Sequence, residues 1–347
     1  MKFRTLGRTG LQVSELCLGS MTWGSQNTMD EGHAQIDMAL DAGVNFIDTA
    51  EMYPVAPISK ETVGDTERVI GEWFAKTGRR EDVILATKIT GEGQKATRDG
   101  APITRDTILT AVDQSLTRLK TDYIDVYQLH WPNRGSYHFR QNWTYDASGQ
   151  DTATTREHMI EVLGTLQDLV SAGKIRHFGT SNETTWGMAQ WLRLSDEGYG
   201  PRAVSIQNEY SLLCRLYDLD LAELGVHEDV TLLAYTPLAA GLLSGKYAGD
   251  VTPEGTRRSR VSDLGGRITP RVWESVSAYL RVAKDHGLDP VQMAIAFVLS
   301  RPFPVVPIIG ATSLDQLKTV LGSVDVTLSE DALADIAAVH KAHPMPF

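Results

Sequence analysis

Cysteine is scarce in this sequence, with only Cys17 and Cys214 among 347 residues. The two lie far apart and have neither CxxC nor Cys/His ligand spacing, so neither a disulfide nor a metal site is expected. No apolar run approaches the roughly 20 residues of a membrane span, and Met1–Arg4 lead into polar sequence without the apolar core of a signal peptide. These absences predict a cytoplasmic protein with no membrane partner.

Positive charge is also in short supply. The chain has 33 Lys and Arg against 44 Asp and Glu, which gives a net charge of −11. This balance argues against nucleic acid as a partner, and any bound anion must be held by a local basic cluster. With 42% hydrophobic and 22% charged residues, the composition is that of a globular protein with an ample core. A small molecule is the expected partner, and assembly into a homo-oligomer is left open.

The glycine motifs of nucleotide-binding folds are missing. No G-x-G-x-x-G occurs, which argues against an open doubly wound sheet with a dinucleotide fingerprint. The stretch "GLLSGKY" at 241–247 differs from a phosphate-binding loop, because its glycines are one residue too close. In addition, Tyr247 stands where that loop requires Ser or Thr. We therefore reject a phosphate loop here.

What the chain does have is a regular alternation of short apolar runs and longer segments with helical periodicity. After a hairpin at Phe3–Leu6 and Gln12–Ser14, eight strands are predicted, at Glu15–Leu18, Asn45–Asp48, Val83–Lys88, Ile124–His130, Ile175–Gly179, Ala203–Asn208, Thr231–Tyr235 and Val305–Ile309. Eight strands that are each followed by a helix form a parallel sheet, and its closure gives a (β/α)8 TIM barrel. We expect one α/β domain over residues 1–347.

Two connections are longer than the others, from His130 to about Arg156 and from Tyr235 to about Pro270. Both follow strands, so both are expected on the C-terminal face, where such barrels have their active sites. The first is rich in aromatic residues. Loops of this length inside a compact domain usually serve a function.

Three successive strands end on ionisable residues. Asp48, Lys88 and His130 stand at the ends of the second, third and fourth strands, and Tyr53 follows in the next loop. Because neighbouring strands are about 4.8 Å apart, these side chains are expected to form one cluster. Asp48 can balance the charge of Lys88, and the ammonium is expected to lower the pKa of the Tyr53 phenol. Tyr53 could then donate a proton to a developing alkoxide, while His130 fixes a carbonyl oxygen.

Each of these residues also has an ordinary structural explanation. A strand-end Asp is often a cap or turn residue, and a strand-end Lys usually extends to solvent. A single His or loop Tyr more often satisfies local hydrogen bonds than performs chemistry. Three different ionisable types on three successive strands, with a Tyr within reach, form a much rarer coincidence. We therefore favour a catalytic cluster.

The motifs around this cluster resemble those of the aldo-keto reductases, and in particular the Tas-like branch, which is similar to the potassium-channel β subunits. The resemblance runs from "LGSMTWG" to the final helix and includes "FIDTAEMYP", "ILATK", "DYIDVYQLHWP", "GKIRHFGTSNE", "LLAYTPLAAGLLSGKY" and "PIIGATSLDQL". It implies that Asp48, Tyr53, Lys88 and His130 are the family tetrad, with Tyr53 as the proton donor. It also implies NADPH as the cofactor, bound without a Rossmann motif.

The resemblance carries further positions over to this chain. It implies nicotinamide contacts at Ser181, Asn182 and Gln207, with the ring stacked on Tyr235. It implies contacts to the rest of the cofactor at Ser20, Met21, Gln26, Thr236, Pro237, Leu238, Leu243, Ser244, Lys246, Gly310, Thr312 and Gln316. Trp23, Trp131 and Trp143 are expected to wall the substrate site, which suits an apolar aldehyde or a ring ketone.

The preference between the two nicotinamide cofactors depends on basic residues. Lys246 and the run Arg257–Arg260 are expected to face the helix start at Thr312–Gln316, with Arg257 as the leading contact to the 2′-phosphate of NADPH. Relatives carry an Arg at the Gln316 position and a Glu-Asn pair at the Thr319 and Val320 positions. Their absence here points to a weaker preference and to altered adenine contacts.

Two other functions compete with a carbonyl reductase. The first is an NADP-sensing or partner-regulating module like the channel β subunits. The resemblance implies that those subunits have an Asn at the position of His130. The second is a non-redox isomerase or lyase, against which Ser181, Asn182 and Gln207 count. Histidine at position 130 favours the enzyme.

Overall fold

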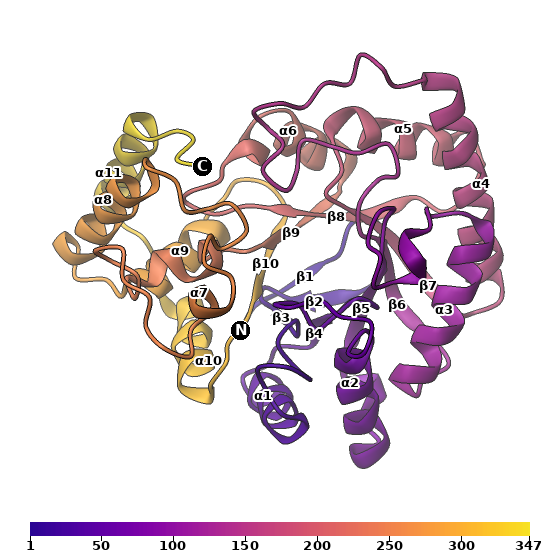
Figure 1. Ribbon diagram of the computed structural model, residues 1–347, viewed down its shortest axis with the longest axis horizontal. Helices are drawn as coiled ribbons and strands as arrows, with labels where there is room; N and C mark the ends of the chain where they lie inside the picture. Colours follow the sequence, from indigo (N-terminus) through magenta and orange to yellow (C-terminus); the bar gives the residue numbers. More distant parts are fainter.

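The computed structural model describes all 347 residues and contains a closed eight-stranded parallel barrel, drawn in Figure 1. Its strands are β3 (Cys17–Gly19), β4 (Phe46–Asp48), β5 (Ile84–Ile89), β6 (Ile124–Leu129), β7 (Ile175–Ser181), β8 (Ala203–Glu209), β9 (Thr231–Tyr235) and β10 (Val305–Ile309). They pair in chain order, and β10 closes the ring against β3. A separate antiparallel hairpin joins β1 (Phe3–Thr5) and β2 (Gln12–Ser14). The predicted TIM barrel and N-terminal hairpin are confirmed.

Helices surround the barrel, as expected for parallel strands that need a crossover between them. They are α1 (Met29–Asp41), α2 (Asp65–Thr77), α3 (Arg105–Leu119), α4 (Thr152–Ser171), α5 (Thr185–Asp196), α6 (Asp220–Glu228), α7 (Arg257–Arg260), α8 (Val272–Asp285), α9 (Pro290–Leu299), α10 (Leu314–Leu321) and α11 (Glu330–Ala342). Five 3₁₀ turns complete the secondary structure, at Arg80–Asp82, Arg98–Gly100, Leu216–Asp218, Ala239–Ser244 and Gly322–Asp325. Several helices begin at side-chain caps, such as Thr28 before α1 and Ser329 before α11.

The core has two parts because the strands separate an inside from an outside. The outer part contains 71 buried residues between the strands and the helices. The inner part contains nine buried residues. Leu6 and Val13 come from the hairpin, and the others are positions within the barrel strands. The hairpin therefore closes the N-terminal end of the barrel, and the apolar interior stops where the polar strand ends begin.

Strand register brings the polar strand ends to one face. Asp48 lies opposite Ala86 on β5, and Lys88 lies opposite Gln128 on β6. Lys88 is two residues beyond Ala86, and His130 is two residues beyond Gln128. Because side chains alternate with a period of two, all these residues point into the barrel at its C-terminal end.

Candidate active site

Lys88 is the centre of the cluster, and its side chain is 0% exposed. Its Nζ donates to Oδ2 of Asp48 at 2.7 Å and to the carbonyl of Thr49 at 2.7 Å. Burial disfavours the charge on Lys88, but Asp48 and then Tyr53 outweigh it, so the pKa of Lys88 is raised above its ordinary value. Lys88 is therefore a permanent cation at neutral pH. Removing either partner of such a buried pair leaves an uncompensated charge.

Tyr53 lies above this pair. Its hydroxyl is 3.5 Å from Nζ of Lys88, and the ammonium is 4.8 Å from the centre of the phenol ring. The sequence predicted a lowered pKa for Tyr53, and this prediction is wrong. Burial raises the pKa of Tyr53 above its ordinary value, and the Lys88 ammonium only partly offsets that effect. The phenol therefore keeps its proton throughout the neutral range, and the ammonium still favours the phenolate once the proton has left.

Asp48 is fixed by more than its ion pair. Its Oδ1 accepts from the side-chain amides of Gln128 at 3.0 Å and Gln207 at 2.8 Å. The Ser20 hydroxyl donates to the Asp48 carbonyl at 2.7 Å. Sequence reasoning missed Gln128, although its place two residues before His130 puts it on the same inward face. The carboxylate is thus oriented from three sides, which fixes the ammonium beneath Tyr53.

His130 borders the same space. Its ring is 5.9 Å from the Tyr53 ring, at an interplanar angle of 75°, and 5.0 Å from the Trp131 ring. Burial, and secondarily the Lys88 ammonium, holds the pKa of His130 well below its usual range. His130 is therefore a neutral imidazole near pH 7. Its buried Nδ1 has no hydrogen-bond partner within the protein.

The predicted nicotinamide residues lie together beside His130. Asn182 has a left-handed backbone, with φ of 52°, a conformation that Asn tolerates better than most residues. Its Nδ2 donates to the His130 carbonyl at 2.9 Å and to the Ser181 hydroxyl at 3.1 Å, while the Tyr235 hydroxyl donates to its Oδ1. Ser181 in turn donates to the carbonyl of Gln207 at 2.8 Å. Contact with a carboxamide, which stays a prediction, requires some of these bonds to be exchanged.

Arg257 reaches across the mouth of the barrel. It begins α7, and its Nη1 is 3.9 Å from the sulfur of Met21, beyond the end of β3. Its Nε is buried and has no hydrogen-bond partner. Burial and the neighbouring Arg267 lower the pKa of Arg257, and Arg257 in turn helps to stabilise the Tyr53 phenolate. An arginine without a carboxylate partner is therefore held close to the tetrad.

Within the expected basic cluster of Lys246 and Arg257–Arg260, Arg258 is already engaged by its own loop. Arg258 pairs with Asp250 and lies over the Trp273 ring at 5.1 Å. Lys246 is exposed and lies 5.2 Å from the centre of the Tyr247 ring. Asp250 thus balances the charge of Arg258, whereas the neighbouring Arg257 reaches Met21 at the mouth.

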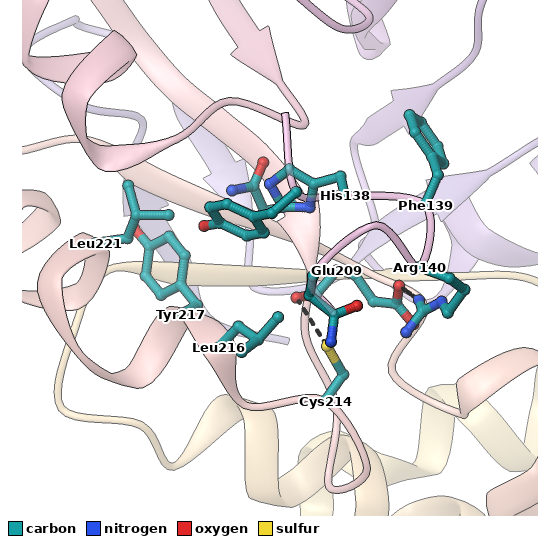
Figure 2. Close-up of a pocket in the computed structure, with 11 residues that line it drawn as sticks. His138, Phe139, Arg140, Glu209, Cys214, Leu216, Tyr217 and Leu221 are labelled. Atoms are coloured by element: carbon teal, nitrogen blue, oxygen red, sulfur yellow. Dashed lines mark hydrogen bonds and ion pairs between the residues drawn. The ribbon is translucent and has the colours of Figure 1, made fainter. Parts of the chain in front are cut away.

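The carboxylate of Glu209, at the end of β8, ties three distant segments together. Arg267 donates to it at 3.0 and 2.8 Å, and Arg140 from the loop after β6 forms a second ion pair, visible in Figure 2. The Phe347 ring at the C-terminus lies 4.6 Å from the Arg140 guanidinium and is only 5% exposed. The crevice drawn there, with Cys214, admits about one water, since its volume is near 10 Å³. This anchor holds both long loops against the barrel, and sequence reasoning missed it.

The start of α10 stays open to solvent. Gly310, Thr312 and Gln316 are exposed, and Oε1 of Gln316 accepts from the backbone and hydroxyl of Thr312 at 3.0 and 3.1 Å. Ser313 caps the helix through the amide of Gln316 at 3.3 Å. The Asn27 amide donates to the Thr312 carbonyl at 3.0 Å, which joins this helix start to the loop after β3. The accessible helix start is compatible with the predicted cofactor contacts.

Three of the predicted contact residues are fully or almost fully buried. Trp23 is 0% exposed, and its Nε1 donates to Gln35 of α1 at 3.0 Å, so it belongs to the outer core and does not line a substrate site. Ser20 is also 0% exposed beneath Asp48, and Leu243 is 1% exposed in the outer core. Their contact with a cofactor stays a prediction. Of the predicted walls, Trp131 packs against His130, whereas Trp143 is 55% exposed and stacks under Arg271.

The remaining predicted positions line the loops around the mouth. Met21 and Gln26 follow β3. Tyr235 ends β9, and the residues after it are Thr236, Pro237, Leu238 and Ser244. No group of three or more His, Cys, Asp or Glu side chains is placed to hold a metal ion. Screening the helices for length and apolar character finds none capable of spanning a membrane.

A (β/α)8 barrel with a buried lysine–carboxylate pair, a phenol and an imidazole at its C-terminal mouth defines a class of oxidoreductases that act on carbonyl compounds. The model of the Aldo/keto reductase family matches residues 15–341. The chain belongs to this family, which generally uses nicotinamide cofactors and small-molecule substrates.

The curated relatives agree with this assignment. The chain is 43% identical to Protein tas of Escherichia coli (strain K12), over 100% of this chain and 99% of that protein. It is 30% identical to the uncharacterized oxidoreductase YrpG of Bacillus subtilis (strain 168), over 96% and 94% of the two chains. It is also 29% identical to a probable voltage-gated potassium channel subunit beta of Arabidopsis thaliana, over 94% and 92%. The predicted resemblance is confirmed.

Proposed function

We propose that this protein reduces an aldehyde or ketone to an alcohol with NADPH as the reductant. The observation that carries the proposal is the buried Lys88–Asp48 pair beneath the Tyr53 hydroxyl, beside a neutral His130. When bound, the reduced nicotinamide would supply a hydride to the carbonyl carbon. The protein's own groups would supply the proton and hold the carbonyl oxygen.

Tyr53 is the proposed proton donor. Its raised pKa keeps the proton on the phenol at neutral pH, so the acid form is always available. As the carbonyl oxygen gains negative charge, the proton passes from Tyr53 to that oxygen and leaves a phenolate next to Lys88. The ammonium stabilises this phenolate, and a proton from solvent restores the phenol after the alcohol leaves.

His130 is the proposed positioning group for the carbonyl oxygen. As a neutral imidazole it has one N–H, which can hydrogen-bond the oxygen without competing with Tyr53 for the transferred proton. Trp131, packed against His130, would bound the substrate on that side. The substrate class that suits these groups is an apolar aldehyde or ketone.

Replacing His130 by Asn should weaken reduction and keep cofactor binding. Asn cannot place a donor at the same distance as the imidazole, so we expect kcat/KM to fall by about tenfold to a hundredfold, the range that corresponds to one hydrogen bond of roughly 1.4–2.8 kcal/mol. Steady-state rates and NADPH titrations would measure both. Unchanged kcat/KM across aldehydes and ketones would contradict a positioning role.

The residues at the mouth fit a phosphate-bearing cofactor. The Nε of Arg257 and the amide nitrogen of Gln26 are buried donors that lack acceptors in the protein, and phosphate or ribose oxygens would satisfy them. The exposed start of α10 offers further donors to the adenosine end. These features suit the phosphates and riboses that NADPH and NADH have in common, and the preference for NADPH is part of the proposal.

Replacing Arg257 by Ala should weaken cofactor binding by about tenfold, because one charged hydrogen bond contributes roughly 1.5–3 kcal/mol. The sequence pointed to the 2′-phosphate, but the contact of Arg257 with Met21, beyond the end of β3, favours the central phosphates that NADPH and NADH share. We therefore expect both dissociation constants to rise together. Arg260→Ala, an exposed change on the same short helix, is the control. If only the dissociation constant of NADPH rose, Arg257 would instead contact the 2′-phosphate, as the sequence predicted.

The proposed reaction is tested by a panel of aldehydes and ketones, followed through the loss of NADPH absorbance. Tyr53→Phe provides the background rate. If no carbonyl in the panel oxidises NADPH faster than this background, the reductase proposal is wrong. The relatives described as potassium channel subunits would then favour the second candidate, a partner-regulating module that binds the cofactor without turnover.

A further inference from the structure

A second cavity lies outside the catalytic mouth, between the starts of α3 and α4, two helices that lie side by side at one flank of the barrel in Figure 1. Its volume is about 400 Å³. Its floor is made by Leu129 and Thr180 at the ends of β6 and β7, and its wall toward α4 by Thr154, Thr155 and Met159. We call this cavity the side pocket. The helices meet beside it, where the amide of Arg105 at the start of α3 donates to Glu161 of α4 at 2.8 Å.

The polar side chains around the side pocket already have partners in the protein. Asn133 exchanges hydrogen bonds of 2.9 Å with both the amide and the carbonyl of Ile103. His158 contacts the same carbonyl at 2.7 Å. Arg134 forms a buried ion pair with Glu183. The Nε of Arg134 is buried without a partner, but the other groups named here satisfy one another and offer no further site for a charged ligand.

Apolar surface is what remains for an occupant. Pro102, Leu129, Trp131, Pro132, Met159 and Trp191 line the side pocket. A dry apolar cavity of about 150 Å³ is enough to bind benzene, so the larger side pocket has room for a two-ring molecule. An anion would lose its hydration there without gaining a free cation, since the guanidinium of Arg134 is paired with Glu183.

Trp131 separates the side pocket from the tetrad. It lines the side pocket and also packs against the His130 ring at 5.0 Å. Its Nε1 donates to the Glu92 carbonyl at 3.1 Å, and the Phe139 ring is 5.7 Å away. Gly91 lies so close that a Cβ there would be 2.2 Å from the indole. These contacts fix the Trp131 indole, which therefore separates the side pocket from the tetrad.

We propose that the side pocket is a second small-molecule site, for a neutral apolar molecule of about two fused rings. None of the four tetrad side chains lines the side pocket, but Trp131 and Ser181 do, and both also border the proposed reaction site. A molecule bound there touches the indole that borders His130. A molecule in the side pocket therefore adjoins the catalytic mouth through two shared side chains, Trp131 and Ser181.

The test uses 1-naphthol as the neutral probe and 1-naphthoate as its anionic counterpart, titrated into the full chain by calorimetry with and without saturating NADPH. We expect saturable binding of 1-naphthol that persists in NADPH, and binding of 1-naphthoate at least tenfold weaker. Thr155→Trp and Thr154→Trp each fill the side pocket from α4 and should weaken 1-naphthol at least tenfold. We use two such plug variants, each with a tryptophan that fills the side pocket, so that the result does not depend on a single variant that fails to fold.

Thr152→Trp is the matched control, because Thr152 is in the same first turn of α4 but does not line the side pocket. It should leave 1-naphthol binding within twofold of the wild type. Equal binding by the wild type and both folded plug variants would place the probe elsewhere and overturn the proposal, as would loss of binding in saturating NADPH. No step of this test requires turnover, so a failure of the reductase proposal would not alter its outcome.

Discussion

Tyr53→Phe should abolish carbonyl reduction while NADPH binding stays within about twofold of the wild type. The substitution removes only the hydroxyl that stands 3.5 Å from Nζ of Lys88, so little volume is lost and the ring stays in place. A positioned general acid contributes about 10²–10⁴-fold to a rate, and the decrease in kcat should fall within this range. Steady-state turnover and a fluorescence titration of NADPH measure the two quantities separately.

The matched control for this change is Tyr145→Phe. Tyr145 is in the long loop on the same face of the barrel, and its hydroxyl accepts a single hydrogen bond, from Gln150 at 3.1 Å. Its loss should leave kcat within about twofold of the wild type. A Tyr53→Phe variant that reduces aldehydes at the wild-type rate would show that the proton comes from another group.

Lys88→Met should be as damaging to catalysis as the loss of Tyr53, and it should also destabilise the fold. Without the ammonium, Asp48 becomes a buried carboxylate with only the amides of Gln128 and Gln207 as partners. Breaking a buried ion pair in this way costs about 3–5 kcal/mol. Urea denaturation of the wild type and the variant measures the difference in the free energy of unfolding.

Two further variants make the Lys88 result specific. Asp48→Asn combined with Lys88→Met removes the charge that was left behind, so the double variant should recover part of the lost stability. Lys174→Met breaks the exposed pair with Asp113 and should cost less than about 1 kcal/mol. If Lys88→Met has the same free energy of unfolding as the wild type, the stability of the fold does not depend on the Asp48–Lys88 ion pair, and the prediction is wrong.

Most of the site could be predicted because it depends on local periodicity. A strand places every second side chain on one face, so Asp48, Lys88 and His130 follow from where three strands end. The barrel itself follows from the repeated strand–helix alternation, and the hairpin from two short runs near the N-terminus. Strand ends differed by a residue or two, since pairing with neighbours decides where a strand stops.

The rest required the tertiary structure, because it depends on which distant groups share a buried space. Burial, which no local pattern encodes, raises the pKa of Tyr53 where a neighbouring ammonium alone would lower it. Arg258 forms an ion pair with Asp250, whereas Arg257 lies at the mouth of the barrel beside Met21. The two arginines are adjacent in sequence, so only the folded structure separates their roles.

Long-range contacts also decided the roles of the aromatic residues. The chain alone does not tell that Trp23 packs under α1, or that Phe347 reaches back to Arg140. In the same way, the side pocket is lined by residues from four separate parts of the chain, which no local pattern brings together. The sequence by itself determined the barrel and the order of charged groups at its mouth, since both repeat at the period of a strand. The tertiary structure decided which side chains are exposed, which charged groups form ion pairs and where the side pocket lies. These features arise from contacts between residues that are far apart in the chain.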